Sequence, residues 1–470
     1  MKSIIKKACF LTAIIFMMFG CNEEYLEVDQ RDDIAFEDSG VVVTPEEMVT
    51  GAYGRFTGFS YAFSYLGITE IISDNSDKGS SPGDTGADKN VLDELTHNIS
   101  SVSIRAMWEE WYKSVGRATI AIGYTQNYDQ NYDDNLRARL IGEAKFLRAL
   151  HYFWLVRAFG DVPLQHVDLI ERAPVSEVYA YIEQNLLEAI EVLPLKNDYA
   201  PRDVGRATKG SAQGLLAKVY LYQEKYQEAY DMTTTLMATN QYGLHPNYAE
   251  LWRASTENGI ESVFEIQGRG EAINHGIQQY SQTQGARGTS GWGWGFNTPS
   301  ENLLNAFNDA GDDIRRDATI IFAGETLFDG REVSSAVQNP RYNEKAYSSL
   351  NAGAGDGDKN IRVLRYAEIL LIRAEAALQI GQDAATPLNM VRARVNLAPI
   401  TSPTMQQIWD ERRLELAMEH DRWFDLLRTG QAADAMDADG KNFIVGKHEL
   451  FPIPNNQLIQ TPTMVQNPGW

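Results

Sequence analysis

The sequence predicts a mainly α-helical protein, in which tetratricopeptide-like helical hairpins form a scaffold beside a loop-rich part with a few short strands. Two observations predict this class. Apolar residues recur every three to four positions through most of the chain, and glycine- and asparagine-rich stretches interrupt that pattern twice. With 470 residues, 43% of them hydrophobic, the chain is long enough to bury a large core.

The charge balance limits the partners that the chain is expected to bind. It holds 64 acidic and 42 basic residues, which gives a formal net charge of −22. Nucleic acids and anionic lipid surfaces are recognised through basic patches, so this balance argues against both. It is compatible with a neutral ligand.

The first twenty residues have the pattern of an export signal. Three lysines within residues 2–7 precede an uncharged apolar run, Ala8 to Gly20, which is shorter than the roughly 20 residues of a membrane span. The run ends in a small residue directly before Cys21. We interpret 1–20 as a lipoprotein signal peptide and Cys21 as the lipidated residue, with an ordinary secretory signal as the alternative.

Cysteine usage favours the lipoprotein interpretation. The only other cysteine, Cys9, lies inside the predicted signal, so the cleaved chain has one thiol and no internal disulfide. Two or more acyl chains on that thiol would anchor the protein stably. Residues 21–44 are acidic with little periodicity, which predicts a lipid-anchored tether, and 45–470 is expected to form a single domain.

Helices are predicted in order from Pro45. Thr44-Pro45-Glu46-Glu47 combines an N-cap residue, a proline at the first helical position and acids in the first turn. Apolar stripes then run through 106–122 and 141–160, and the second covers most of a helix circumference, so that helix is expected to be buried. Asp161-Val162-Pro163 ends it, and another helix follows from Ser176.

One helical hairpin has the residue spacing of a tetratricopeptide repeat. Alanines at the close contact let two antiparallel helices approach, and a tyrosine fills the groove beside them. A second hairpin is expected from 361–380 and Pro387–Asn396, with Gly381 at the turn. A generic helical bundle is the alternative. The repeat residues, at relative positions 0, 1, 4 and 13, are Leu216, Ala217, Tyr220 and Ala229.

Two loop-rich insertions, around 70–105 and 240–360, interrupt the helices. Within the second, residues 261–267 alternate like a strand, and 285–295 reads GARGTSGWGWG. In an extended segment Trp292 and Trp294 would face the same side, while the glycines would let a ligand approach the backbone. Long loops inside a helical chain are either functional or disordered.

This tryptophan pair is a candidate ligand platform. Its rings would stack on the apolar faces of a sugar, and Arg287 would satisfy sugar hydroxyls. In the early insertion, Asn75 and Asp77 are further candidate partners for hydroxyls. The alternatives are that the indoles fill a hydrophobic gap under the loop, and that Asn75 and Asp77 stabilise a turn.

No pattern of residues predicts catalysis. We find no G-x-S-x-G motif, phosphate loop or zinc spacing, and the seven histidines are scattered, so no enzymatic activity, metal or cofactor is predicted. Residues 411–428 are dense in glutamate and arginine around His420. We expect a buried network of ion pairs between helices there.

Eight blocks in order carry a resemblance to the SusD/RagB family of outer-membrane nutrient-binding lipoproteins from Bacteroidetes. They are the motif ending at Cys21, Trp108-x3-Tyr112, GEAKFLRALHYFWLVRAFGDVPL at 142–164, RATKGSAQGLLAKVYLY at 206–222, ESVFEIQ at 261–267, LRYAEILLIRAEA at 364–376, and the segments 411–430 and 451–470.

The resemblance implies a helical scaffold against an irregular loop-rich half, without enzymatic activity. It implies a lipid-anchored protein facing the cell exterior, which caps a SusC-like TonB-dependent transporter in the outer membrane and captures oligosaccharides. Ligand residues would lie in 74–100 and 280–300. The alternatives are a peptide-binding member of the same transport system, an exported glycosidase, and a helical scaffold that binds only protein.

Overall fold

The computed structural model describes residues 43–81, 83–84, 86–164, 171–268, 270, 276–348 and 357–470, and residues 45–470 form one compact unit. The predicted signal peptide, Cys21 and the tether as far as residue 42 lie outside the described residues. Within the described ranges, no helix is both long enough and apolar enough to cross a membrane.

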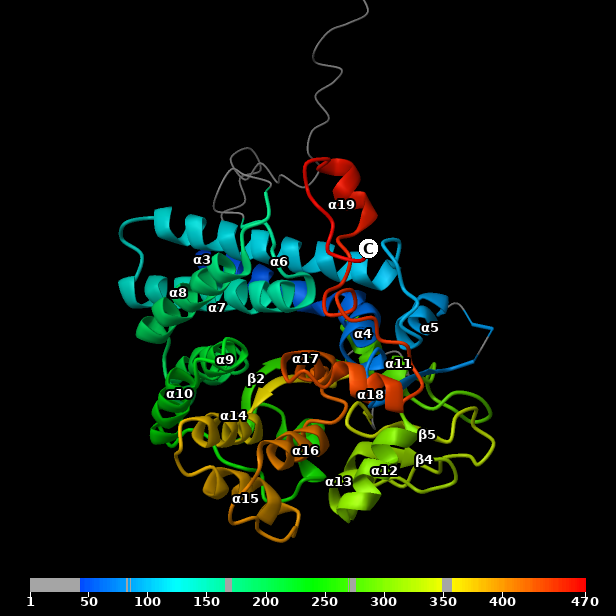
Figure 1. Cartoon of the computed structure of the whole chain (residues 1–470). Coiled ribbons are helices and arrows are strands. Elements are labelled where there is room, and N and C mark those ends of the chain that lie inside the picture. The colour runs from blue at the N-terminus through cyan, green and yellow to red at the C-terminus, as the bar shows by residue number, and fades with distance from the viewer. Residues whose placement is uncertain are drawn as a thin grey trace, which may run out of the picture. The chain divides into compact units, whose positions relative to one another are not determined.

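Four of the first six helices were predicted from the sequence. The helices Phe59–Leu66 and Ala87–Asp93 were not, and the second of them lies within the stretch around 70–105 that was expected to be loop-rich. Side chains of Ser101 and Asp133 cap the two longest, and the second of these is buried around most of its circumference, as predicted. The helices Val102–Asn127, Asp134–Phe159 and Val175–Val192 lie side by side (Figure 1). The six helices are α3 (Pro45–Tyr53), α4 (Phe59–Leu66), α5 (Ala87–Asp93), α6 (Val102–Asn127), α7 (Asp134–Phe159) and α8 (Val175–Val192).

The predicted tetratricopeptide-like hairpin is confirmed. Helices α9 (Lys209–Tyr222) and α10 (Tyr226–Ala238) pack against each other, and Ala217 and Ala229 are both fully buried where they meet. A second hairpin consists of α14 (Tyr366–Gln379) and α15 (Ala385–Arg394). It packs beside the first, because α14 contacts α10 (Figure 1). Gly381 has a φ of 69°, which suits its predicted place at the turn.

The structure corrects the start of the second hairpin. Ile361–Arg365 forms strand β6, not the first turn of a helix, and pairs antiparallel with β2 (Ser262–Ile266). The run IRVLR is too short to separate a helical from a strand period, and its strand partner lies about a hundred residues earlier. The predicted strand is confirmed. All five residues of β2 are buried, so the alternation of polar and apolar residues in its sequence does not correspond to one exposed and one buried face.

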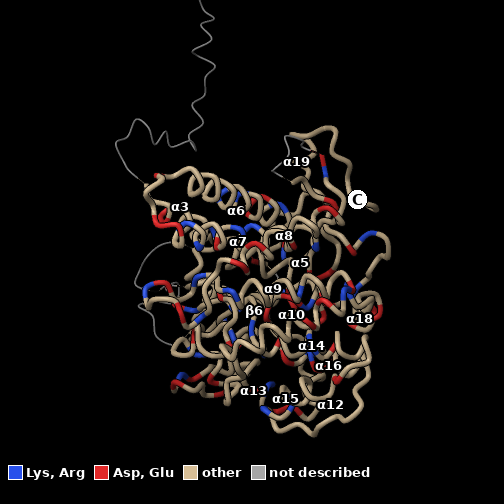
Figure 2. The backbone as a smooth tube through the Cα atoms, turned by 90° about the vertical axis from the view of Figure 1, so that its left-hand side faces the viewer, with Lys and Arg blue, Asp and Glu red and all other residues tan. Residues whose placement is uncertain are grey.

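The remaining elements are short and complete a mainly α-helical fold with few strands. In the view of Figure 2, acidic and basic residues are interspersed along the backbone. These elements are β1 (Ser76–Gly79), α11 (Tyr280–Gln284), β3 (Phe296–Pro299), α12 (Glu301–Ala310), α13 (Asp313–Thr319), β4 (Ile320–Phe322), β5 (Arg341–Asn343), α16 (Met405–Glu415), α17 (Arg422–Arg428), α18 (Ala432–Ala438) and α19 (Asn455–Gln460).

Candidate functional site

The charged segment 411–428 builds a buried ion-pair network, as predicted. Arg365 Nη1 lies 2.6 Å from Glu415 and 2.7 Å from Glu261, and Arg315 lies 3.0 Å from Glu415 and 2.7 Å from Glu411. All five side chains are buried. A buried guanidinium is stable only when carboxylates and carbonyls satisfy its donors, so these contacts explain the density of charge.

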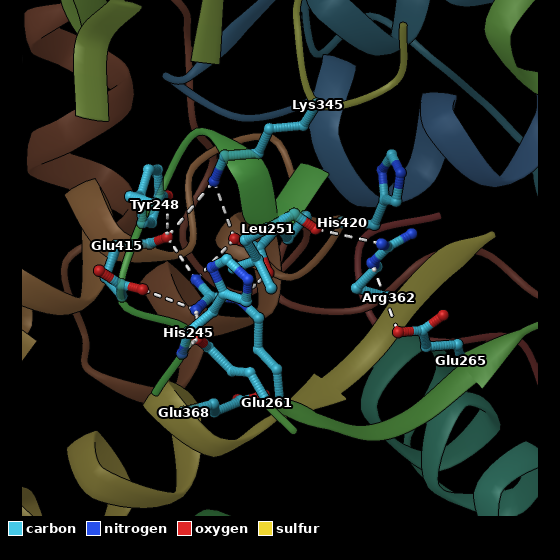
Figure 3. A network of polar contacts seen from close by, with 12 residues as sticks. His245, Tyr248, Leu251, Glu261, Glu265, Lys345, Arg362, Glu368, Glu415 and His420 are labelled. Atoms are coloured by element: carbon cyan, nitrogen blue, oxygen red, sulfur yellow. Dashed lines mark hydrogen bonds and ion pairs between the residues drawn. The ribbon is translucent and has the colours of Figure 1, made fainter. Parts of the chain in front are cut away.

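Further groups converge on the same network from other elements (Figure 3). The Tyr248 hydroxyl donates to the backbone carbonyl of Glu415 at 2.9 Å, and Lys345 Nζ donates to it at 3.3 Å. Burial opposes ionisation of the Glu415 carboxyl, but Arg394, Arg365 and Arg315 together hold its pKa below the ordinary value. The network therefore joins the helices around it as ionised pairs.

His420 belongs to this structural core. Its Nε2 lies 2.6 Å from the Tyr280 hydroxyl, and burial lowers its pKa to about 4, so the ring is neutral at physiological pH. In the part of the chain that the structure describes, no group of three or more histidine, cysteine, aspartate or glutamate residues is placed to hold a metal ion.

The two predicted ligand regions meet in a small antiparallel sheet. Strand β1 pairs with β3, with Asp77 opposite Thr298 and Gly79 opposite Phe296. Arg287 fastens the end of this sheet, because its Nη1 donates to Ser80 Oγ at 2.8 Å and to the carbonyl of Trp294 at 3.4 Å. Segments more than two hundred residues apart thus form one surface, with Arg287 half-buried between them.

Asn75 and Asp77 do not join the tryptophans. Asn75 is only 1% exposed, and its Oδ1 accepts a hydrogen bond of 2.9 Å from Arg413 Nε, so its side chain is not presented to a ligand. Asp77 is half-buried near Asp93 and Lys441. Burial, reinforced by Asp93, raises the pKa of Asp77 to about 6. Both side chains therefore face surroundings different from those of Trp292 and Trp294.

The tryptophan segment is not extended. The N–H groups of Trp292 and Gly293 both donate to the carbonyl of Ala286, at 2.8 and 2.9 Å, and the N–H of Trp294 donates to Gln282 at 2.8 Å. These bonds fold the segment back against α11 with a bend at Gly293. Trp292 and Trp294 would face the same side only in an extended segment. Because this segment is folded, the two indoles contact different neighbours.

Trp292 fills a gap under the loop. Its ring meets Tyr347 edge-on, with centroids 5.5 Å apart, and the Arg331 guanidinium lies 5.0 Å from its centroid. It packs against a buried cluster that includes Ala286 and Tyr342. Its Nε1 is buried and has no hydrogen-bond partner among the described residues. Trp292 is half-buried, as Trp294 is, but its contacts with this cluster are those of the alternative interpretation, an indole that fills a gap under the loop.

Trp294 instead joins two phenylalanines in what we name the aromatic surface, Phe59, Phe63 and Trp294. Its ring lies 6.1 Å from Phe59 and 6.4 Å from Phe63, both edge-on, while Phe59 and Phe63 stack at 5.5 Å. Phe59 is 40% exposed and the other two are half-buried. Aromatic rings with an exposed face can stack on the apolar face of a ligand, while neighbouring polar groups bind its hydroxyls.

Sequence reasoning missed Phe59 and Phe63. They lie four residues apart on α4 and so share one face of that helix, whereas Tyr61 and Tyr65 are buried. That spacing was available as a signal. Their contact with Trp294 was not, because it depends on how distant segments pack.

Comparisons with known proteins agree with the resemblance in sequence. Residues 260–470 match the model of the SusD family, and residues 29–221 match a model described as starch-binding associating with outer membrane. The solved structure of a laminarin-binding SusD-like protein is 30% identical, and the match covers 91% of this chain and 99% of that chain with a TM-score of 0.79.

Two curated relatives are similar over most of their length. SusD-like protein P2 of Formosa agariphila is 28% identical, over 90% of this chain and 91% of that protein. The starch-binding protein SusD of Bacteroides thetaiotaomicron is 27% identical, over 70% of this chain and 72% of that protein.

Proposed function

This chain belongs to the SusD family, and on that premise we propose that it is a cell-surface protein that binds oligosaccharide. The observation that carries the proposal is the aromatic surface, where Trp294, Phe59 and Phe63 lie partly exposed beside the β1–β3 sheet. Sugar rings have apolar faces that stack on such side chains. The names of the laminarin-binding and starch-binding relatives support the same class of ligand.

In this proposal the predicted residues have different roles. Trp294 stacks on the sugar, and Arg287 positions it by binding its carbonyl oxygen while offering a half-buried guanidinium to hydroxyl groups. Trp292 supports the loop from beneath. Asn75, which precedes β1, is held by Arg413 of α16, and Asp77 lies within β1 opposite Thr298.

We further propose that the protein binds without catalysis and is anchored in the outer membrane through Cys21, where it passes oligosaccharide to a SusC-like TonB-dependent transporter. The family model described as associating with outer membrane supports this location. Replacing Cys21 with serine should release the protein from the membrane fraction. Retention of the C21S chain in that fraction would contradict the lipid anchor.

A binding comparison between glycans and peptides tests the proposed function. The full chain, purified in detergent, is applied to an array of neutral glycans and to a peptide library, and the hits are measured by calorimetry. We expect binding to at least one glycan and a weaker response in the Trp294→Ala variant. Binding to peptides alone would favour the peptide-binding alternative, and release of reducing sugar would favour a glycosidase.

A further inference from the structure

A second cleft, of about 350 Å³, lies apart from the aromatic surface and shares none of its residues. Its walls come from residues within 250–255, from Phe328 in the β4–β5 connection, and from Tyr347, Ser348, Asp358 and Lys359. We propose that this cleft is a second carbohydrate-binding site, which takes a neutral sugar ring on Phe328. The inference rests on the proposed function, since it assigns the same class of ligand to a new site.

A tight hairpin presents Phe328 to this cleft. The N–H of Leu327 donates to the carbonyl of Arg331 at 2.9 Å, and that of Val333 donates to Glu325 at 2.8 Å. These bonds close residues 325–333 into a hairpin between β4 and β5, with Phe328 near its tip. Phe328 keeps 50% of its surface exposed, so one part of the ring is open to a ligand beside the cleft.

The Phe328 ring is held in place from within the protein. The guanidinium of Arg253 lies 3.4 Å from its centroid, and Tyr347 meets it edge-on at 5.8 Å. Arg253 is itself fixed by an ion pair of 3.0 Å with Glu344. A ring that is already immobilised loses little conformational entropy when a sugar stacks on it, which favours binding.

Two residues of the cleft carry unused hydrogen-bond donors. Trp252 Nε1 and Arg253 Nε are buried and have no acceptor within the described parts of the chain, although both residues line the cleft. Buried donors are nearly always satisfied by protein, water or ligand. A sugar supplies hydroxyl and ring oxygens, which are acceptors of the kind that these two N–H groups lack.

The charge of the lining favours a neutral sugar. The lining holds two acids, Glu250 and Asp358, and two bases, Arg253 and Lys359, so it has no net formal charge. Arg253 is already paired with Glu344, which leaves it less able to compensate an anionic ligand. The volume lies within the range of small-molecule sites. Together these features select an uncharged oligosaccharide over an acidic polysaccharide.

Paired variants separate the two sites. The full chain in detergent is titrated by calorimetry with laminarihexaose and with maltohexaose, as wild type, Phe328→Ala, Trp294→Ala and Ile120→Ala. Ile120 is the matched control, because it is 54% exposed on α6 and lines neither site. We expect two binding events, of which F328A weakens one by about fivefold to tenfold and W294A weakens the other, while I120A changes neither.

The outcomes distinguish this inference from the proposed function. A single event that W294A removes and F328A leaves unchanged overturns the second site but keeps the proposed function. Binding that responds to F328A and not to W294A supports the cleft and overturns the role of the aromatic surface. No binding of either hexasaccharide overturns the second site, while the glycan array decides the proposed function. If F328A does not fold, Phe328→Leu removes the ring while keeping an apolar group, and the same loss is expected.

Discussion

The side-chain carboxyl group of Glu70 accepts a hydrogen bond of 2.7 Å from the backbone N–H of His420, and a second, of 3.2 Å, from the N–H of Met418. Both donors belong to residues with positive φ, 70° for His420 and 64° for Met418, a conformation that costs such residues energy. Glu70 is fully buried in the π-helical turn Gly67–Ile71. One buried side chain therefore holds the strained turn between α16 and α17.

This arrangement predicts a pH dependence of stability. Burial raises the pKa of Glu70 from its ordinary 4.5 to about 8, although the two N–H groups oppose the shift. Between these values the folded protein keeps a proton that the unfolded chain releases, so the contribution of Glu70 to stability falls as pH rises. In Glu70→Gln that titration is absent. Urea unfolding from pH 5 to pH 8 should show the wild type losing up to about 1.4 kcal/mol per pH unit relative to the variant. Parallel curves for the two proteins would contradict the assignment.

Neighbouring arginines in α13 should differ sharply in their effect on stability. Arg315 is completely buried and binds Asp312, Glu411 and Glu415, whereas Arg316 pairs with the exposed Asp313. Replacing Arg315 with alanine removes one cationic partner from three buried carboxylates. Glu415 and Glu411 keep other arginines, but Asp312 loses its ion pair, so the change should cost about 3–5 kcal/mol of unfolding free energy. Chemical denaturation measures this cost.

Arg316→Ala is the matched control for that change, since both substitutions replace an arginine of α13 with alanine. Its ion pairs are exposed to solvent, so we expect a loss below about 1 kcal/mol. Similar losses for R315A and R316A would mean that the buried network does not stabilise the fold in the way that its geometry indicates.

The sequence predicted two kinds of feature. One is a contact between residues close together in the chain, and the other is a buried charged group, which must have a partner of opposite charge. The α9–α10 hairpin was predictable because Ala217 and Ala229 meet across a short turn. The ion-pair network was predictable because charges on a buried segment need partners. Strand β6 was not, because IRVLR takes its conformation from pairing with Ser262–Ile266, which no local period encodes.

The candidate site was predictable only in outline. Loop composition located the β1–β3 region, but three hydrogen bonds to Ala286 and Gln282 fold the tryptophan segment and turn its rings toward different neighbours. Phe59 comes to Trp294 from a helix more than two hundred residues earlier. Such contacts are set by tertiary packing, and a spacing rule that assumes an extended backbone cannot anticipate them.

The two tryptophans should therefore respond differently to alanine substitution. Trp294→Ala removes a ring of the aromatic surface, and should weaken oligosaccharide binding by about fivefold to tenfold with little loss of stability. Trp292→Ala opens a cavity beside Tyr347, and should cost about 1–3 kcal/mol of stability with a smaller effect on affinity at the aromatic surface. Calorimetry and urea unfolding on both variants measure the two effects. Equal losses of affinity would indicate that the rings act as one platform after all.

Gly79 is the position where backbone geometry and the proposed site are most directly coupled. It has a φ of 67°, and a Cβ placed there would overlap the carbonyl oxygen of Gly295, the residue after Trp294. Gly79→Ala should therefore push β1 away from β3, costing about 1–3 kcal/mol and weakening oligosaccharide binding through the displaced Trp294. Gly123→Ala in α6 is the control, because nothing lies within 4 Å of its added Cβ, and it should stabilise the helix by about 0.5–1 kcal/mol. Unfolding and calorimetry should thus give changes of opposite sign in stability and a loss of affinity in G79A alone. If the G79A protein binds oligosaccharide as the wild type does, the geometry of the β1–β3 sheet does not determine binding at the aromatic surface.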